Sequence, residues 1–121
     1  YPFRALQLLE GTGIRRGIAI NPVTSAEAVI PFLGRVDTVL FMSVEPGFGG
    51  QKFLPGTLDK IRTLRRAADS AGADLRISVD GGVGEANAAL LRQAGADELI
   101  VGTGFFKASD PTGFIRFLKG L

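Results

Sequence analysis

The sequence predicts a parallel α/β fold, made of four strand–helix units that amount to half of an eight-stranded barrel. Short apolar segments alternate with segments whose apolar residues recur at the helical period of about 3.6 residues. The apolar segments are hydrophobic throughout, as is typical of parallel strands that are covered on both faces. Three of them end in glycine-rich turns, at 47–50, 81–82 and 102–104.

Four strands are expected, at 17–21, 37–43, 75–79 and 98–102. The first ends at Pro22, which cannot donate a ladder hydrogen bond. The others carry the apolar runs at 39–42, 75–79 and 99–101. Because helical segments separate them, neighbouring strands are expected to run parallel and to pair in sequence order.

Helices are expected at 2–11, 26–33, 55–71, 85–94 and 111–119. Ser25 is a candidate N-cap of the second helix, and Asp110 of the last. Gly72 and Gly95 stand where glycine commonly ends a helix. Each follows an alanine in an Ala-Gly-Ala-Asp repeat, at 71–74 and 94–97, so Asp74 and Asp97 are expected to have structural roles at helix exits.

Two architectures fit four such units. In a (β/α)8 barrel the chemistry lies at the C-terminal ends of the strands, where all three glycine turns fall here. An open Rossmann-like sheet is the alternative, but its fingerprint G-x-G-x-x-G is absent, because Gly102-Thr-Gly104 is followed by two phenylalanines. The half-barrel is therefore the preferred prediction.

The glycine turns predict an anion site. Glycines let the backbone approach a ligand closely, and several N–H groups converging from neighbouring strand ends are a common way to bind phosphate. A flexible loop would explain one such turn, but less readily the same feature at three strand ends.

Composition excludes several classes of protein. The formal net charge is +2, and its basic residues fall mainly in helical segments, which argues against a nucleic-acid surface. No cysteine is present, so disulfides and thiolate metal sites are excluded. No apolar run is long enough to span a membrane. Histidine is absent and the chain begins at Tyr1 with helical spacing, so we expect a fragment or a processed chain.

Three motifs resemble the ribulose-phosphate 3-epimerase family. They are Met42-Ser-Val-Glu-Pro-Gly-Phe-Gly-Gly-Gln51, Val79-Asp-Gly-Gly-Val83 and Val101-Gly-Thr-Gly-Phe-Phe106. The resemblance covers essentially the whole chain and the C-terminal half of the family's ribulose-phosphate-binding TIM barrel. The pair of the first two motifs is highly specific at this separation.

The resemblance implies a metal-dependent epimerase of the pentose phosphate pathway, which interconverts D-ribulose 5-phosphate and D-xylulose 5-phosphate through an enediolate. It assigns Asp80 two roles, acid/base catalyst and ligand of one divalent metal ion (Zn, Fe, Mn or Co). The family's second aspartate, two histidines and a serine have no counterpart here, so this chain alone is expected to be inactive.

The remaining site residues are expected to contact the sugar phosphate. They are Gly47, Phe48, Gly49, Gly50, Gly81, Gly82, Gly102 and Thr103, together with Met42, which either lines this pocket or packs in the core. Glu45 is not expected to act as a base, because the family varies at this position. Asp37 begins its strand at the far end and is expected to be structural.

Two alternatives stay open: an epimerase of another ketose phosphate such as allulose 6-phosphate, and a phosphate-binding half-barrel without catalysis. We expect one partial domain over 1–121, a sugar-phosphate substrate, no nucleic-acid or membrane partner, a homo-oligomer and a cytoplasmic location.

Overall fold

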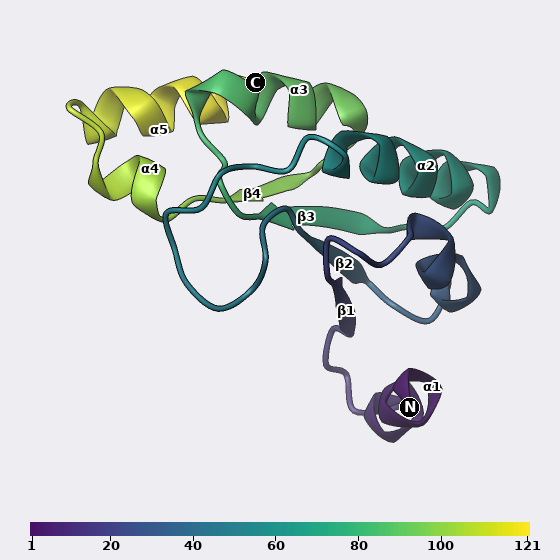
Figure 1. The fold of residues 1–121 in the computed structure, drawn as a ribbon. Helices are drawn as coiled ribbons and strands as arrows, with labels where there is room; N and C mark the ends of the chain where they lie inside the picture. Colours follow the sequence, from purple (N-terminus) through teal and green to yellow (C-terminus); the bar gives the residue numbers. More distant parts are fainter.

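The computed structural model describes all 121 residues, and its centre is a four-stranded parallel sheet (Figure 1). The strands are β1 (Gly17–Ile20), β2 (Thr38–Met42), β3 (Arg76–Asp80) and β4 (Glu98–Ile100). They pair in the order β1-β2-β3-β4, and every neighbouring pair is parallel. The predicted strands and their order are confirmed, with ends that differ by one or two residues.

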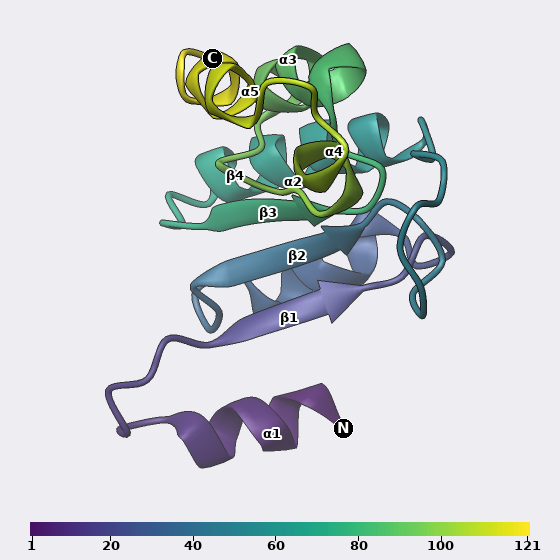
Figure 2. The same ribbon diagram turned by 90° about the vertical axis from the view of Figure 1, so that its left-hand side faces the viewer.

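Helices cover one face of this sheet. They are the 3-10 helix η1 (Ala26–Phe32) and the α-helices α2 (Thr57–Ser70), α3 (Glu85–Ala94) and α5 (Pro111–Lys119), while the short α4 (Thr103–Phe106) follows β4. Along this layer η1 contacts α2, α2 contacts α3, and α3 contacts α5. Figure 2 shows the opposite face without a helix and α1 (Pro2–Leu9) lying beyond the edge strand β1. Coverage of one face only is the half-barrel arrangement and contradicts the Rossmann-like alternative.

The hydrophobic core lies between the sheet and these helices. Val39 and Phe41 of β2 and Ile77 and Val79 of β3 are fully buried, at alternate positions along each strand. Side chains at alternate strand positions point to opposite faces, so the intervening residues, among them Met42 and Asp80, face the open side. The packing of the covered face therefore determines which residues face the cavity described below.

Two helix termini follow their predicted chemistry. Gly72 has φ +64°, its N–H donates to the carbonyl of Asp69, and the N–H of Ala73 donates to that of Ala68. This pair of bonds is a Schellman motif and ends α2. At the start of α5, the carboxylate of Asp110 accepts a hydrogen bond from the N–H of Gly113 at 3.0 Å, as expected of an N-cap.

The segment predicted as an α-helix at 26–33 is instead the 3-10 helix η1. Pro31 lies inside it, and an internal proline lacks the N–H that an α-helix needs and clashes with the preceding turn. Ser25 occupies the N-cap position, but its side chain makes no capping hydrogen bond. The first and third helices are also shorter than predicted, ending at Leu9 and beginning at Thr57.

Two aspartates at the N-terminal ends of strands are structural, as expected. Asp37 accepts a hydrogen bond from the N–H of Arg16 at 2.6 Å, and Asp97 accepts one from the N–H of Ile77 at 2.8 Å. The guanidinium of Arg65 also donates to Asp97. Each carboxylate therefore connects the start of its own strand to the backbone at or just before the neighbouring strand.

None of the helices combines the length and the hydrophobicity that a membrane-spanning segment needs.

Candidate functional site

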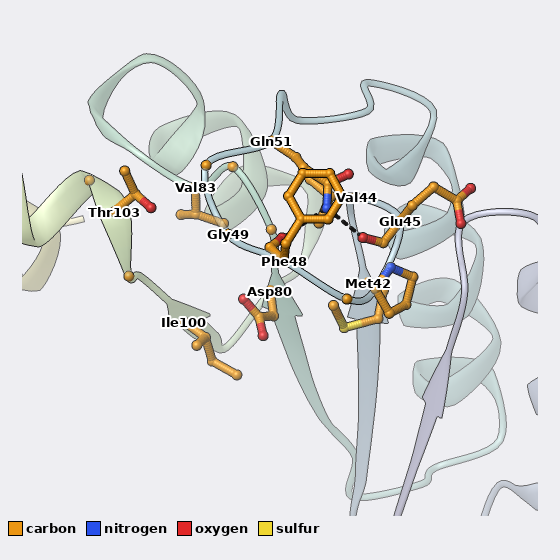
Figure 3. Close-up of a pocket in the computed structure, with 17 residues that line it drawn as sticks. Met42, Val44, Glu45, Phe48, Gly49, Gln51, Asp80, Val83, Ile100 and Thr103 are labelled. Atoms are coloured by element: carbon orange, nitrogen blue, oxygen red, sulfur yellow. Dashed lines mark hydrogen bonds between the residues drawn. The ribbon is translucent and has the colours of Figure 1, made fainter.

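A cavity of about 480 Å³ lies at the C-terminal ends of β2, β3 and β4. Figure 3 shows how the turns that follow these strands surround it. Every residue that the sequence analysis placed in the site lines this one cavity: Met42, Gly47, Phe48, Gly49, Gly50, Asp80, Gly81, Gly82, Gly102 and Thr103. The structure thus brings together three motifs that are spread over residues 42–106 of the chain, while the roles assigned to them stay predictions.

The first wall is the loop after β2. Gln51 closes it, because its side-chain amide donates to the carbonyl of Glu45 at 2.6 Å and to that of Phe48 at 2.8 Å. Phe48 stands at the tip with 74% of its surface exposed. The loop therefore has a fixed base and an apolar side chain free to contact a ligand.

The second wall is the turn Asp80-Gly81-Gly82, which packs tightly against the first. The buried hydroxyl of Ser43 donates to the carbonyls of Asp80 (3.0 Å) and Gly81 (2.6 Å). A Cβ atom at Gly82 would lie 2.5 Å from the backbone nitrogen of Phe53. Glycine is required there because the backbone of residues 51–53 passes too close for a side chain.

The third wall comes from the end of β4 and the start of α4. Gly102, Thr103 and Gly104 all line the cavity. A Cβ atom at Gly49 would lie 3.6 Å from the hydroxyl oxygen of Thr103, so the first and third walls approach each other closely. Glycine backbone and one hydroxyl group therefore face the cavity from this side.

Asp80 lies at the cavity's base, in a lateral row of three side chains. The strand register pairs Met42 with Asp80 and Asp80 with Ile100, and Figure 3 shows the carboxylate between these two neighbours. Asp80 is half-buried, and no side-chain hydrogen bond or ion pair of the chain engages its carboxylate. A carboxylate held this way is available to a proton or a cation.

Three residues that the structure places in or beside this site were not predicted to have a role. Ser43 fixes the turn after β3, Gln51 closes the first loop, and Ile100 lines the cavity beside Asp80. Ser43 and Gln51 both lie within a motif quoted above, but neither was assigned to the site. Their roles, and the place of Ile100 beside Asp80, depend on contacts and a strand register that only the structure shows.

The residues present do not by themselves fit the divalent metal implied by the resemblance. No three His, Cys, Asp or Glu side chains are grouped so that they could hold a metal ion. In the cavity, the only carboxylates are those of Asp80 and Glu45. No reaction step is therefore assigned to a metal.

Comparison with known proteins identifies relatives over nearly the whole chain. Residues 1–106 match the ribulose-phosphate 3 epimerase family. A ribulose-phosphate 3-epimerase of Escherichia coli (strain K12) is 43% identical over 107 residues, which make up 88% of this chain and 48% of the relative. That of Aquifex aeolicus is 42% identical over 118 residues, covering 98% of this chain and 53% of the relative. The chain spans about half the length of the curated relatives it matches.

Solved structures show the same fold at lower identity. A 3-hexulose-6-phosphate synthase superimposes with a TM-score of 0.65 at 20% identity, over 96% of this chain and 53% of that structure. The synthase from Salmonella typhimurium gives 0.63 at 22% identity, over 98% and 52%. These likenesses show the fold alone, in which the four βα units correspond to about half of a TIM barrel.

Proposed function

The chain belongs to the ribulose-phosphate 3-epimerase family, and we propose that it forms the phosphate-binding half of an enzyme that interconverts D-ribulose 5-phosphate and D-xylulose 5-phosphate. In this proposal the glycine turns bind the phosphate, and Asp80 transfers a proton at C3 of the sugar. Action in the cytoplasm as a homo-oligomer, within the pentose phosphate pathway, is part of the same proposal.

One observation carries the proposal: a carboxylate with no partner in the chain lies at the base of a cavity whose walls are glycine-rich turns. Backbone N–H groups of such turns suit the oxygens of a phosphate group. A carboxylate without a partner in the chain can accept a proton from a carbon atom. The reacting carbon of the substrate is several bonds from its phosphate, so the proposal requires the two to contact different parts of the cavity.

The chemistry that Asp80 would perform is a proton transfer. The C3–H bond lies beside the C2 ketone, so removal of the C3 proton leaves an enediolate whose negative charge is carried mainly by the C2 oxygen. Asp80 accepts the C3 proton in one direction and donates a proton to C3 in the other. Inversion needs a second acid/base on the opposite side of the planar intermediate, and no residue of this chain is assigned to that role.

A divalent metal stays a proposal that rests on the family resemblance alone. When bound, it would stabilise the enediolate as a Lewis acid. This chain offers Asp80 for it but no group of three ligands.

The test is Asp80→Asn in the whole polypeptide that contains residues 1–121. Asparagine keeps the size of the side chain but cannot carry the proton, so turnover should fall by about 10²–10⁴-fold. For the epimer whose C3 proton Asp80 removes, exchange of the C3 hydrogen with solvent deuterium should fall in parallel, while phosphate-dependent binding stays close to that of the unmodified protein. Asp74→Asn is the matched control, because Asp74 lies in a hollow at the opposite end of the sheet with Asp37 and Asp97.

Near-normal epimerase activity of Asp80→Asn would exclude Asp80 as the acid/base. If the unmodified polypeptide binds sugar phosphates but neither epimerises them nor exchanges the C3 hydrogen, the binding module without catalysis is the correct alternative.

A further inference from the structure

Ser43 joins two of the three walls of the cavity. It directly follows β2 and is fully buried. Its carbonyl accepts a hydrogen bond from the N–H of Leu54 at 2.8 Å, which links the two ends of the first loop, and its N–H donates to the carbonyl of Asp80 at 2.9 Å. The backbone of this one residue therefore connects the first wall to the end of β3.

The hydroxyl of Ser43 extends this connection by one peptide. Besides the Asp80 carbonyl, it reaches the carbonyl of Gly81 at 2.6 Å, and this is the only hydrogen bond that the Gly81 carbonyl accepts within the chain. Gly81 has φ +126°, a conformation open mainly to glycine, and glycine follows it at position 82. Because neither residue has a side chain, the peptides of this turn are restrained by contacts from the first wall.

The position of the Asp80 carboxylate depends on this turn. The carboxylate has no hydrogen-bond or ion-pair partner of its own in the chain, so a displacement of the Asp80 backbone displaces the carboxylate as well. A group that transfers a proton must stay within hydrogen-bond reach of its target, and a displacement of about 1 Å can cost about 10²-fold in rate. Proton transfer by Asp80 therefore requires a turn that is held in place.

We propose that Ser43 is a positioning residue for the proton transfer by Asp80. Its hydroxyl holds the turn after β3 against the first loop, so that the carboxylate keeps a constant place relative to the walls that would bind the phosphate. This inference rests on the proposed function, because it takes Asp80 as the acid/base. It reaches beyond stability: loss of the hydroxyl should slow the reaction in molecules that are fully folded.

The test is Ser43→Ala in the whole polypeptide that contains residues 1–121. Alanine removes the hydroxyl and keeps both backbone hydrogen bonds of residue 43. At a temperature below the onset of unfolding, kcat for D-ribulose 5-phosphate should fall about tenfold or more, because the carboxylate is displaced. KM should change much less, because the glycine backbone proposed to bind the phosphate is retained.

Two further variants separate positioning from stability. Ser43→Thr retains the hydroxyl and should keep kcat near the original value. Ser78→Ala is the matched control, because Ser78 is also buried and lies on β3, but its hydroxyl donates to the carboxylate of Glu98 at 3.0 Å and it does not line the cavity. Its loss should leave kcat unchanged. If a thermal melt shows that Ser43→Ala does not fold, Ser43→Cys takes its place, since a thiol is a weak donor, and its kcat should also fall.

The failure of this inference differs from the failure of the proposed function. An original kcat in folded Ser43→Ala, a rise in KM alone, a low kcat in Ser43→Thr, or an equal fall in Ser78→Ala overturns the positioning role of Ser43. An unmodified polypeptide without epimerase activity, or near-normal turnover by Asp80→Asn, contradicts the proposed function itself.

Discussion

Replacing Gly82 and Gly50 separately by alanine should have different consequences, although both glycines line the cavity with positive φ. Gly82 has φ +64° and Gly50 has φ +77°. A Cβ atom at Gly82 would lie 2.5 Å from the nitrogen and 2.9 Å from the Cα of Phe53, both backbone atoms. A Cβ atom at Gly50 would meet nothing within 4 Å.

The expected losses of stability follow from these contacts. An alanine in the left-handed region costs about 1–2 kcal/mol, which is the whole expected cost for Gly50→Ala. At Gly82 the backbone of the neighbouring segment must also move, and forcing atoms into a packed site costs typically about 1–3 kcal/mol more. The free energy of unfolding should therefore fall by about 2–5 kcal/mol for Gly82→Ala.

Denaturant unfolding of both variants, each compared with the unmodified whole polypeptide, measures the two free energies. Binding of a sugar phosphate is measured alongside, and Gly50→Ala should weaken it more than its small loss of stability explains. Equal losses of stability for the two variants would show that the turn after β3 does not pack against residues 51–53 as described, and the account of the second wall would be wrong.

Three further outcomes are expected. Ser43→Ala should lower the free energy of unfolding by about 1–2 kcal/mol in a denaturant titration, since the carbonyls of Asp80 and Gly81 lose their buried hydroxyl donor; an unchanged value would contradict that role. Gln51→Leu should raise KM more than it lowers kcat in steady-state assays, because the loop loses both side-chain hydrogen bonds at its base; a fall in kcat alone would point to a direct catalytic role. Asp97→Ala should lower the melting temperature but leave kcat unchanged, because its carboxylate holds strand starts at the end of the sheet away from the cavity; lost turnover in a folded protein would refute its structural role.

Local signals in the sequence predicted the sheet and most helix ends correctly. Gly72 and Asp110 form their capping hydrogen bonds with residues three positions away in the chain. Their roles can therefore be predicted without knowing the rest of the fold. The error at 26–33 is also local: the apolar spacing is helical, but Pro31 removes an α-helical hydrogen bond and leaves a 3-10 helix. Pro31 is the residue in this segment that distinguishes a 3-10 helix from an α-helix.

The location of the site could be predicted because it depends only on the order of the strands. Parallel strands that pair in sequence order bring their C-terminal ends to one edge, so the three glycine turns had to meet. Contacts between side chains of different strands depend on the register of the strands. A shift of one residue turns every side chain of a strand to the opposite face of the sheet. The pairing of Asp80 with Ile100 and the bond from Ser43 to Gly81 therefore became visible only in the structure.

The glycines of the cavity serve two different purposes, although the sequence analysis read them all as room for a ligand. At Gly81 and Gly82 the space that a side chain would occupy is already filled by Val44 and Phe53, so these glycines allow the walls to pack against each other. At Gly50 and Gly102 that space is empty, so a ligand can approach the backbone there. The phosphate is therefore expected to contact the backbone around Gly50 and Gly102 most closely, while the turn after β3 mainly holds Asp80 in position between them.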